Sequence, residues 1–94
     1  MNIPDFKKTI VKDEIPAGLP LHVQALWHDG KGNWAEAHSL IDHLDDRQAA
    51  HVHAYLHRKE GDLWNADYWY RRAGKQRPDS TLGAEWEALL SLYL

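Results

Sequence analysis

The chain has 94 residues, of which 44% are hydrophobic and 27% are charged, and its formal net charge at pH 7 is −3. This length suffices for one small domain around a single core and excludes a second catalytic domain. The chain contains no cysteine, so disulfides and thiolate zinc sites are excluded and any metal would need histidine or carboxylate ligands. No segment approaches the roughly 18 apolar residues of a membrane span or the apolar run of a signal peptide. We therefore expect a soluble, cytoplasmic protein without a membrane partner.

The first 19 residues are interrupted by Pro4, Pro16 and Gly18. Proline and glycine are the strongest local interruptions of regular structure, and no helical period of apolar residues survives among them. Segment 1–19 is therefore predicted to be an irregular, extended N-terminal arm, and segment 20–94 a single helical domain.

A first helical hairpin is predicted over about 20–44. Pro20 suits the first turn of a helix, and apolar residues follow it at helical spacing. Asn33 with Glu36 three residues later is a capping-box pair, which opens the second helix of the hairpin.

A second hairpin is predicted over about 46–76, with Asp45 and Gln48 as its capping pair and Gly61 at its turn. A capping helix over about 80–94 follows. These patterns predict an all-α fold of two antiparallel hairpins and a capping helix.

The two hairpins are related by an internal repeat. Without gaps and at an offset of 29 residues, "ALWHDGKGNWAEAH" aligns with "AYLHRKEGDLWNAD". The alignment pairs two small residues, one histidine and one turn glycine of each copy: Ala25 with Ala54, His28 with His57, Gly32 with Gly61, and Ala37 with Ala66. Both copies are therefore predicted to be the same kind of helix-turn-helix unit.

The second copy resembles a tetratricopeptide repeat, because Ala54, Ala66, Tyr70, Ala73 and Pro78 stand at that family's spacing. The resemblance covers roughly 20–78. It implies stacked hairpins whose first helices line a concave groove for a protein or peptide. The positions that match the groove are His22, Leu26, Gln48, His51, Tyr55, Arg58 and Lys59.

We therefore expect a protein- or peptide-interaction module, with Tyr55 as an aromatic anchor and Arg58 holding a carboxylate of the partner. Five tryptophans exceed what so small a core can hold, which also predicts a homodimer. No serine has a nucleophile elbow and no glycine-rich phosphate loop is present, so we expect neither catalysis nor a cofactor.

The histidines offer an alternative function. His53 and His57 lie one helical turn apart, a spacing that allows both rings to reach one metal, and His28, His38 or Asp67 could complete the site. This pattern favours a small metal- or ligand-binding protein or enzyme. Because the repeat places His57 and His28 at equivalent positions, a packing role is the preferred interpretation.

Segment 47–77 carries seven basic and three acidic residues, so it is +4 while the rest of the chain is −7. Its aromatic run "LWNADYWYRR" could stack on bases, with Arg71 and Arg72 on phosphates. Packing against the neighbouring hairpin explains the same rings, so nucleic-acid binding is the minor alternative.

Overall fold

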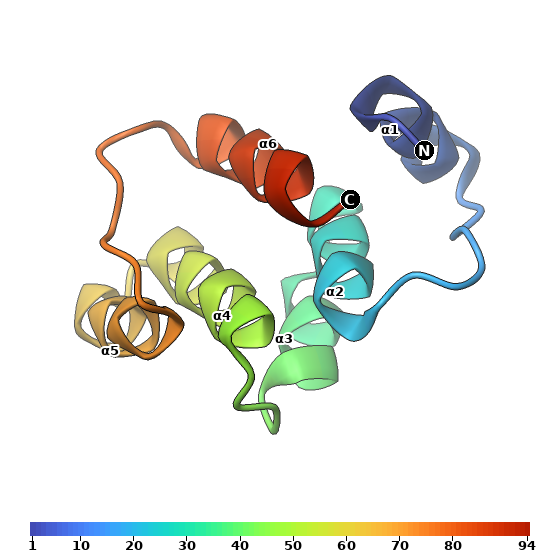
Figure 1. The fold of residues 1–94 in the computed structure, drawn as a ribbon. Helices are drawn as coiled ribbons and strands as arrows, with labels where there is room; N and C mark the ends of the chain where they lie inside the picture. Colours follow the sequence, from blue (N-terminus) through green and yellow to red (C-terminus); the bar gives the residue numbers. More distant parts are fainter.

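The computed structural model describes residues 1–94 and contains six α-helices and no strands (Figure 1). The predicted all-α class is confirmed. The helices are α1 (Ile3–Lys12), α2 (Leu21–Gly30), α3 (Trp34–Ile41), α4 (Arg47–Glu60), α5 (Leu63–Ala73) and α6 (Leu82–Tyr93).

The helices form two hairpins and two covering helices. Helix α2 packs on α3, and α4 packs on α5, each pair joined by a short turn. Helix α6 crosses back over α4 and α2, and α1 lies against α6 (Figure 1). The two ends of the chain therefore close over the same side of the hairpins.

Side-chain caps begin the helices close to where the sequence predicts them. Asn33 Oδ1 accepts a hydrogen bond from the Glu36 amide at 3.2 Å, as the capping pair implies. The predicted cap of α4 is wrong by one residue: Asp46, not Asp45, accepts from the Ala49 amide. The backbone of Asp46 is extended (φ −68°, ψ 158°), which aims its carboxylate at that amide.

The irregular arm predicted over 1–19 is wrong for its first part, where α1 forms. Asn2 Oδ1 accepts from the Asp5 amide at 2.8 Å, and Pro4 stands in the first turn, where its missing N–H costs no helical hydrogen bond. Phe6 is fully buried and packs near Trp86 of α6, with ring centroids 6.2 Å apart. Burial of this ring stabilises a short helix that the sequence periodicity alone did not reveal.

One apolar cluster spans α1, α2, α3, α4 and α6, with Phe6, Leu26, Ile41, Leu56 and Leu90 among its buried members. A smaller cluster of Ala54, Ala66 and Tyr70 joins α4 to α5. The small residues let these two helices approach closely. None of the helices has the length and hydropathy that a membrane crossing requires.

Candidate metal centre

Three histidines from two helices converge between the hairpins. His38 of α3 and His53 and His57 of α4 each place a ring nitrogen within 4.8 Å of the others. The Nε2 atoms of His38 and His53 are 3.1 Å apart. His53 and His57 lie on one face of α4 because they are four residues apart, and α3 packs along that face and supplies the third ring.

The centre is buried on the α4 side and open on the α3 side. His53 and His57 are 3% and 6% exposed. The side chain of His38, in contrast, is 25% exposed. The cluster is therefore closest to solvent at His38.

A carboxylate holds the His57 ring from outside, and a second one lies near the His38 ring. Glu60 Oε1 lies 2.6 Å from His57 Nδ1, and Asp42 Oδ2 lies 3.9 Å from His38 Nδ1. Because the Glu60 carboxylate accepts a proton at hydrogen-bond distance, His57 Nδ1 is assigned as N–H, which leaves Nε2 of that ring with its lone pair. Carboxylates orient metal-binding imidazoles in the same way in known metal sites.

His53 is the histidine whose polar atoms are not satisfied. Its Nε2 faces His38, whereas its Nδ1 is buried and has no hydrogen-bond partner. The pKa of His53 is lowered to about 4, mainly by burial and to a smaller extent by the neighbouring His57 and His38. Burial and the proximity of His57 also lower the pKa of His38. The two rings are therefore neutral at pH 7, the form that coordinates a metal.

Two tryptophans wall the centre. Trp34 stacks on His38 with ring centroids 4.9 Å and planes 8° apart, and Trp69 of α5 stacks on His53 at 4.0 Å and 21°. Trp34 is itself held by a 2.7 Å hydrogen bond from its Nε1 to the Leu56 carbonyl. The stacked rings restrict rotation of both imidazoles.

The spacing of the ring nitrogens suits a tetrahedral ion. Zinc–nitrogen bonds of about 2.0–2.1 Å place neighbouring nitrogens about 3.3 Å apart, close to the 3.1 Å between His38 and His53. A second group of donors, His57, Glu60 and Asp62, also lies within 4.8 Å, with its two carboxylates exposed.

Of the three candidate residues for completing the site, the structure places only His38 beside His53 and His57. His28 lies against Trp27 instead, with ring centroids 5.1 Å apart. Asp67 pairs with Arg77 at 2.9 Å. Sequence reasoning did not assign roles to Glu60, Trp34 or Trp69; the signal that could have identified Glu60 is its position three residues after His57 on one helix.

The open groove predicted from the repeat is wrong for three of its positions. Leu26 and Tyr55 are 0% and 2% exposed, and His51 is buried with its Nδ1 2.8 Å from the Tyr93 hydroxyl. Helix α6 lies over this stripe of α2 and α4, so the chain covers the surface that a partner was expected to use. The reason is that α6 packs inward as part of the core, with Leu89 and Leu90 buried, and does not extend the repeat.

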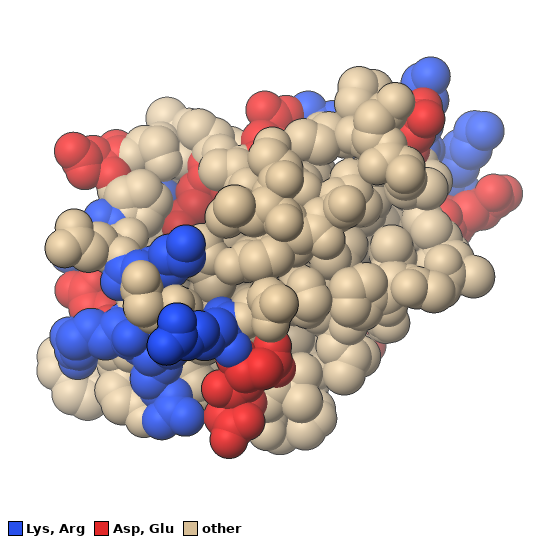
Figure 2. Space-filling model, viewed as in Figure 1, with Lys and Arg blue, Asp and Glu red and all other residues tan.

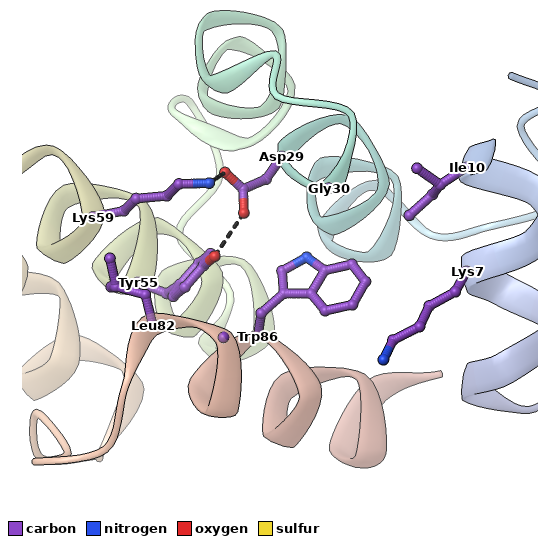
Figure 3. A pocket seen from close by; sticks show the side chains of 9 residues that line it. Lys7, Ile10, Asp29, Gly30, Tyr55, Lys59, Leu82 and Trp86 are labelled. Carbon is purple, nitrogen blue, oxygen red and sulfur yellow. Dashed lines mark hydrogen bonds and ion pairs between the residues drawn. The ribbon is translucent and has the colours of Figure 1, made fainter.

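The two predicted groove cations bind carboxylates of the chain itself. Arg58 donates to Glu85 Oε1 of α6 at 2.8 Å. Lys59 reaches Asp29 Oδ1 at 2.8 Å, and Tyr55 donates to Asp29 Oδ2 at 2.6 Å (Figure 3). Asp29, Tyr55 and Lys59 line a pocket of about 370 Å³ between α1, α2, α4 and α6.

The remaining two groove positions lie apart from that pocket. His22 is half-buried, its ring 5.2 Å from that of Tyr93, and burial lowers its pKa. Gln48 is exposed near the start of α4. Binding of a partner by these two residues stays a prediction.

Comparisons with known proteins give no relative from which a role could be transferred. No family model matches the chain, and no significant match is found among curated proteins or among solved structures. The tetratricopeptide resemblance therefore stays a prediction, and the function has to be argued from the side chains.

Proposed function

We propose that this protein binds a divalent transition metal, preferably zinc, through His38, His53 and His57. The observation that carries the proposal is the convergence of three ring nitrogens within 4.8 Å from two helices. Imidazole is a ligand for zinc, copper, iron and nickel, and zinc accepts three protein ligands readily.

The poor hydrogen bonding of the buried His53 ring argues against a purely structural role. Buried polar atoms in proteins are nearly always hydrogen-bonded, and an unsatisfied one costs about 1–3 kcal/mol. His53 Nδ1 has no partner, and its Nε2 has only another imidazole. Packing alone would favour an apolar residue at this position, whereas a metal ion on Nε2 would replace the imidazole–imidazole contact with a coordinate bond.

The surrounding groups support metal binding independently of the three ligands. Glu60 orients His57, so that ring turns its Nε2 lone pair away from the carboxylate, and Asp42 lies 3.9 Å from the outer nitrogen of His38. The lowered pKa values of His38 and His53 keep both rings unprotonated at neutral pH.

Three neutral protein ligands leave a fourth position for water or another small ligand. A zinc ion held in this way keeps its full positive charge and polarises the group in that position. The exposed side of His38 gives access to it. The proposed class is thus a small metal-binding protein with an open coordination position.

Isothermal titration of chelator-treated, tag-free protein with Zn²⁺ tests the proposal. We expect one ion per chain. His38→Ala should weaken binding at least about tenfold, the size of effect that even an outer-shell change produces. His53→Ala and His57→Ala should do the same.

His43→Ala is the matched control, since its side chain is 66% exposed and it is in none of the groups that could hold an ion. It should bind as the unmodified chain does. Binding that survives His38→Ala in a variant with unchanged circular dichroism would contradict the proposal, and so would titration without saturable uptake.

A further inference from the structure

The outer face of α5 exposes two aromatic side chains to solvent. Trp64 is 79% exposed and Tyr68 is 38% exposed. They lie one helical turn apart, so their side chains share one side of α5. Arg71 and Arg72 continue that side at the next turn, and both are exposed. We call Trp64, Tyr68, Arg71 and Arg72 the α5 stripe.

Positive charge gathers around this stripe. Figure 2 shows Lys and Arg side chains clustered over the region of α5 and the segment that follows it. Arg71, Arg72, Lys75 and Arg47 are exposed, and none of them takes part in an ion pair. Arg47 of α4 joins the cluster because its Nη1 lies 3.7 Å from the point where a Cβ on Gly74 would stand. The stripe itself contains no carboxylate.

A small polar hollow lies beside the stripe. It has a volume of about 180 Å³ and is lined by Arg71, Lys75, Arg77, Gln76, Asp67 and Tyr70. The one carboxylate in the lining, that of Asp67, already pairs with Arg77 at 2.9 Å. Arg71 and Lys75 therefore remain free to bind an anion there.

One guanidinium is already held beside the rings. Arg72 lies 5.7 Å from the centre of the Tyr68 ring and 5.2 Å from that of Trp69, and it donates to the Tyr68 hydroxyl at 3.2 Å. This contact restricts the cation at the edge of the aromatic surface. An arginine stacked beside exposed rings is an arrangement that single-strand binding surfaces use.

We propose that the α5 stripe binds single-stranded nucleic acid, with bases stacked on Trp64 and Tyr68 and phosphates held by Arg71, Arg72 and Lys75. Every base offers a ring face for stacking, and the backbone supplies an anion beside each base. The net charge of −3 does not oppose this binding, because basic residues outnumber acidic ones by seven to three over 47–77 and charges beyond about 10 Å are largely screened at 0.1 M salt.

An acidic protein surface is the competing occupant, because tryptophan, tyrosine and arginine also dominate protein interfaces. Such a partner needs an apolar pocket for its anchoring side chains. The hollow beside the stripe is polar and cationic, which matches a phosphate better than an apolar anchor. The observations therefore favour nucleic acid.

Fluorescence anisotropy with labelled ten-nucleotide dT and U strands at 50 mM salt tests the proposal. We expect saturable binding that persists in EDTA, so that its failure and the failure of metal binding are separate results. Trp64→Ala should weaken binding at least about fivefold, the lower end of what one stacked base contributes. Raising the salt to 200 mM should weaken binding steeply, because phosphate contacts release counterions.

A charge-matched pair of variants isolates the stripe. Arg71→Gln with Arg72→Gln should weaken binding at least tenfold. Lys8→Gln with Lys12→Gln, which removes the same charge from α1, should change binding less than twofold. All four side chains are exposed, so folding should be unaffected and circular dichroism checks it.

Three results would overturn the proposal. The first is no saturable binding of either strand at 100 µM protein. The second is equal weakening by the two charge-matched pairs, which would indicate non-specific attraction. The third is tighter binding of a labelled ten-residue glutamate peptide than of both strands, which would assign the stripe to an acidic protein partner.

Discussion

Trp69 lies nearly parallel to His53, with ring centroids 4.0 Å and planes 21° apart. Its other neighbour is the guanidinium of Arg72, 5.2 Å from the ring centre. One indole thus separates the histidine centre from the cationic outer face of α5. Because it touches a proposed ligand directly, Trp69 should report on events at the metal centre.

The first prediction uses this contact. A paramagnetic ion such as Cu²⁺ quenches tryptophan fluorescence over short distances, and Trp69 and Trp34 both stack on proposed ligands. We expect stoichiometric Cu²⁺ to quench a large part of the emission. Trp69→Phe should remove much of that quenched fraction while retaining the ring stack.

Trp86 of α6 provides the control, because it packs near Phe6 of α1 and donates to the Leu26 carbonyl of α2 at 3.0 Å, and it contacts none of the three histidines. In the Trp86→Phe variant, the decrease in emission intensity on Cu²⁺ addition should be nearly the same as in the unmodified chain. Equal loss of quenching in the two variants would place the ion somewhere other than the histidine centre.

The second prediction concerns stability in acid. Burial lowers the pKa of both His51 and His53 from 6.5 to about 4. Between these values the unfolded chain binds more protons than the folded chain, so the free energy of unfolding falls as the pH drops from 6.5 towards 4. Each histidine should account for roughly 2 kcal/mol of lost stability by pH 5.

Urea unfolding in EDTA at pH 7.5 and pH 5 measures this loss. His51→Gln, which can still bond to the Tyr93 hydroxyl, should reduce the difference between the two pH values. His43→Gln should not, because that ring is exposed. A stability that is flat over this range would show that the two rings are not buried in the neutral form.

Local signals in the sequence were sufficient to predict the two hairpins. Caps such as Asn33 and Asp62 and the left-handed Gly61, with φ of 90°, act within a few residues and can therefore be recognised without tertiary information. Helix α1 was missed because its stability depends on burial of Phe6 against residues at the other end of the chain. Such long-range packing leaves no local period.

The candidate site was predictable only in part. The spacing of His53 and His57 on one helix is a local fact, whereas the choice of His38 over His28 depends on how α3 crosses α4. The prediction that Tyr55 lines an open groove was wrong for a related reason, since only the tertiary fold shows that α6 covers this residue. The spacing of a repeat does not determine where a terminal helix packs.

The homodimer stays a prediction, but the number of tryptophans supports it less once their burial is known. Trp27 is buried, and Trp34, Trp69 and Trp86 are half-buried within the chain. Trp64 alone is exposed, so the tryptophans are not in surplus as the composition suggested. Sedimentation over a hundredfold concentration range remains the direct test.

The third prediction concerns a buried carboxylate on α6. Glu85 is 4% exposed, accepts from the Tyr70 hydroxyl at 2.5 Å and pairs with Arg58 at 2.8 Å. Glu85→Ala would leave Arg58 and Tyr70 without this acceptor. Removing one partner of a buried ion pair typically costs about 3–5 kcal/mol, and we expect a loss of that size in urea unfolding.

Glu87 gives the matched control two residues further along α6. It pairs with Lys7, but both side chains are about half exposed, and exposed pairs contribute little. Glu87→Ala should therefore change stability by less than about 1 kcal/mol. Similar losses in the two variants would mean that α6 does not bury Glu85 against α4 and α5.

The last prediction tests the contact of α1 with the rest of the fold. A Cβ on Gly30 would stand 2.8 Å from Ile10 Cδ1 and 2.9 Å from Trp86 Cζ2, so the side chains of Ile10 on α1 and Trp86 on α6 could not both keep their positions. Overpacking of this kind typically costs about 1–3 kcal/mol, which exceeds the gain of up to about 1 kcal/mol that alanine brings to a helix.

Gly83, near the start of α6, isolates that helical gain because nothing lies within 4 Å of its would-be Cβ. Gly83→Ala should raise the free energy of unfolding by about 0.4–1 kcal/mol, whereas Gly30→Ala should lower it. Amide hydrogen exchange should also become faster in α1 of the Gly30→Ala variant, because the Ile10 side chain is displaced from its contact with residue 30. If both substitutions stabilise the chain equally, α1 does not pack against Gly30, and its position beside Trp86 is wrong.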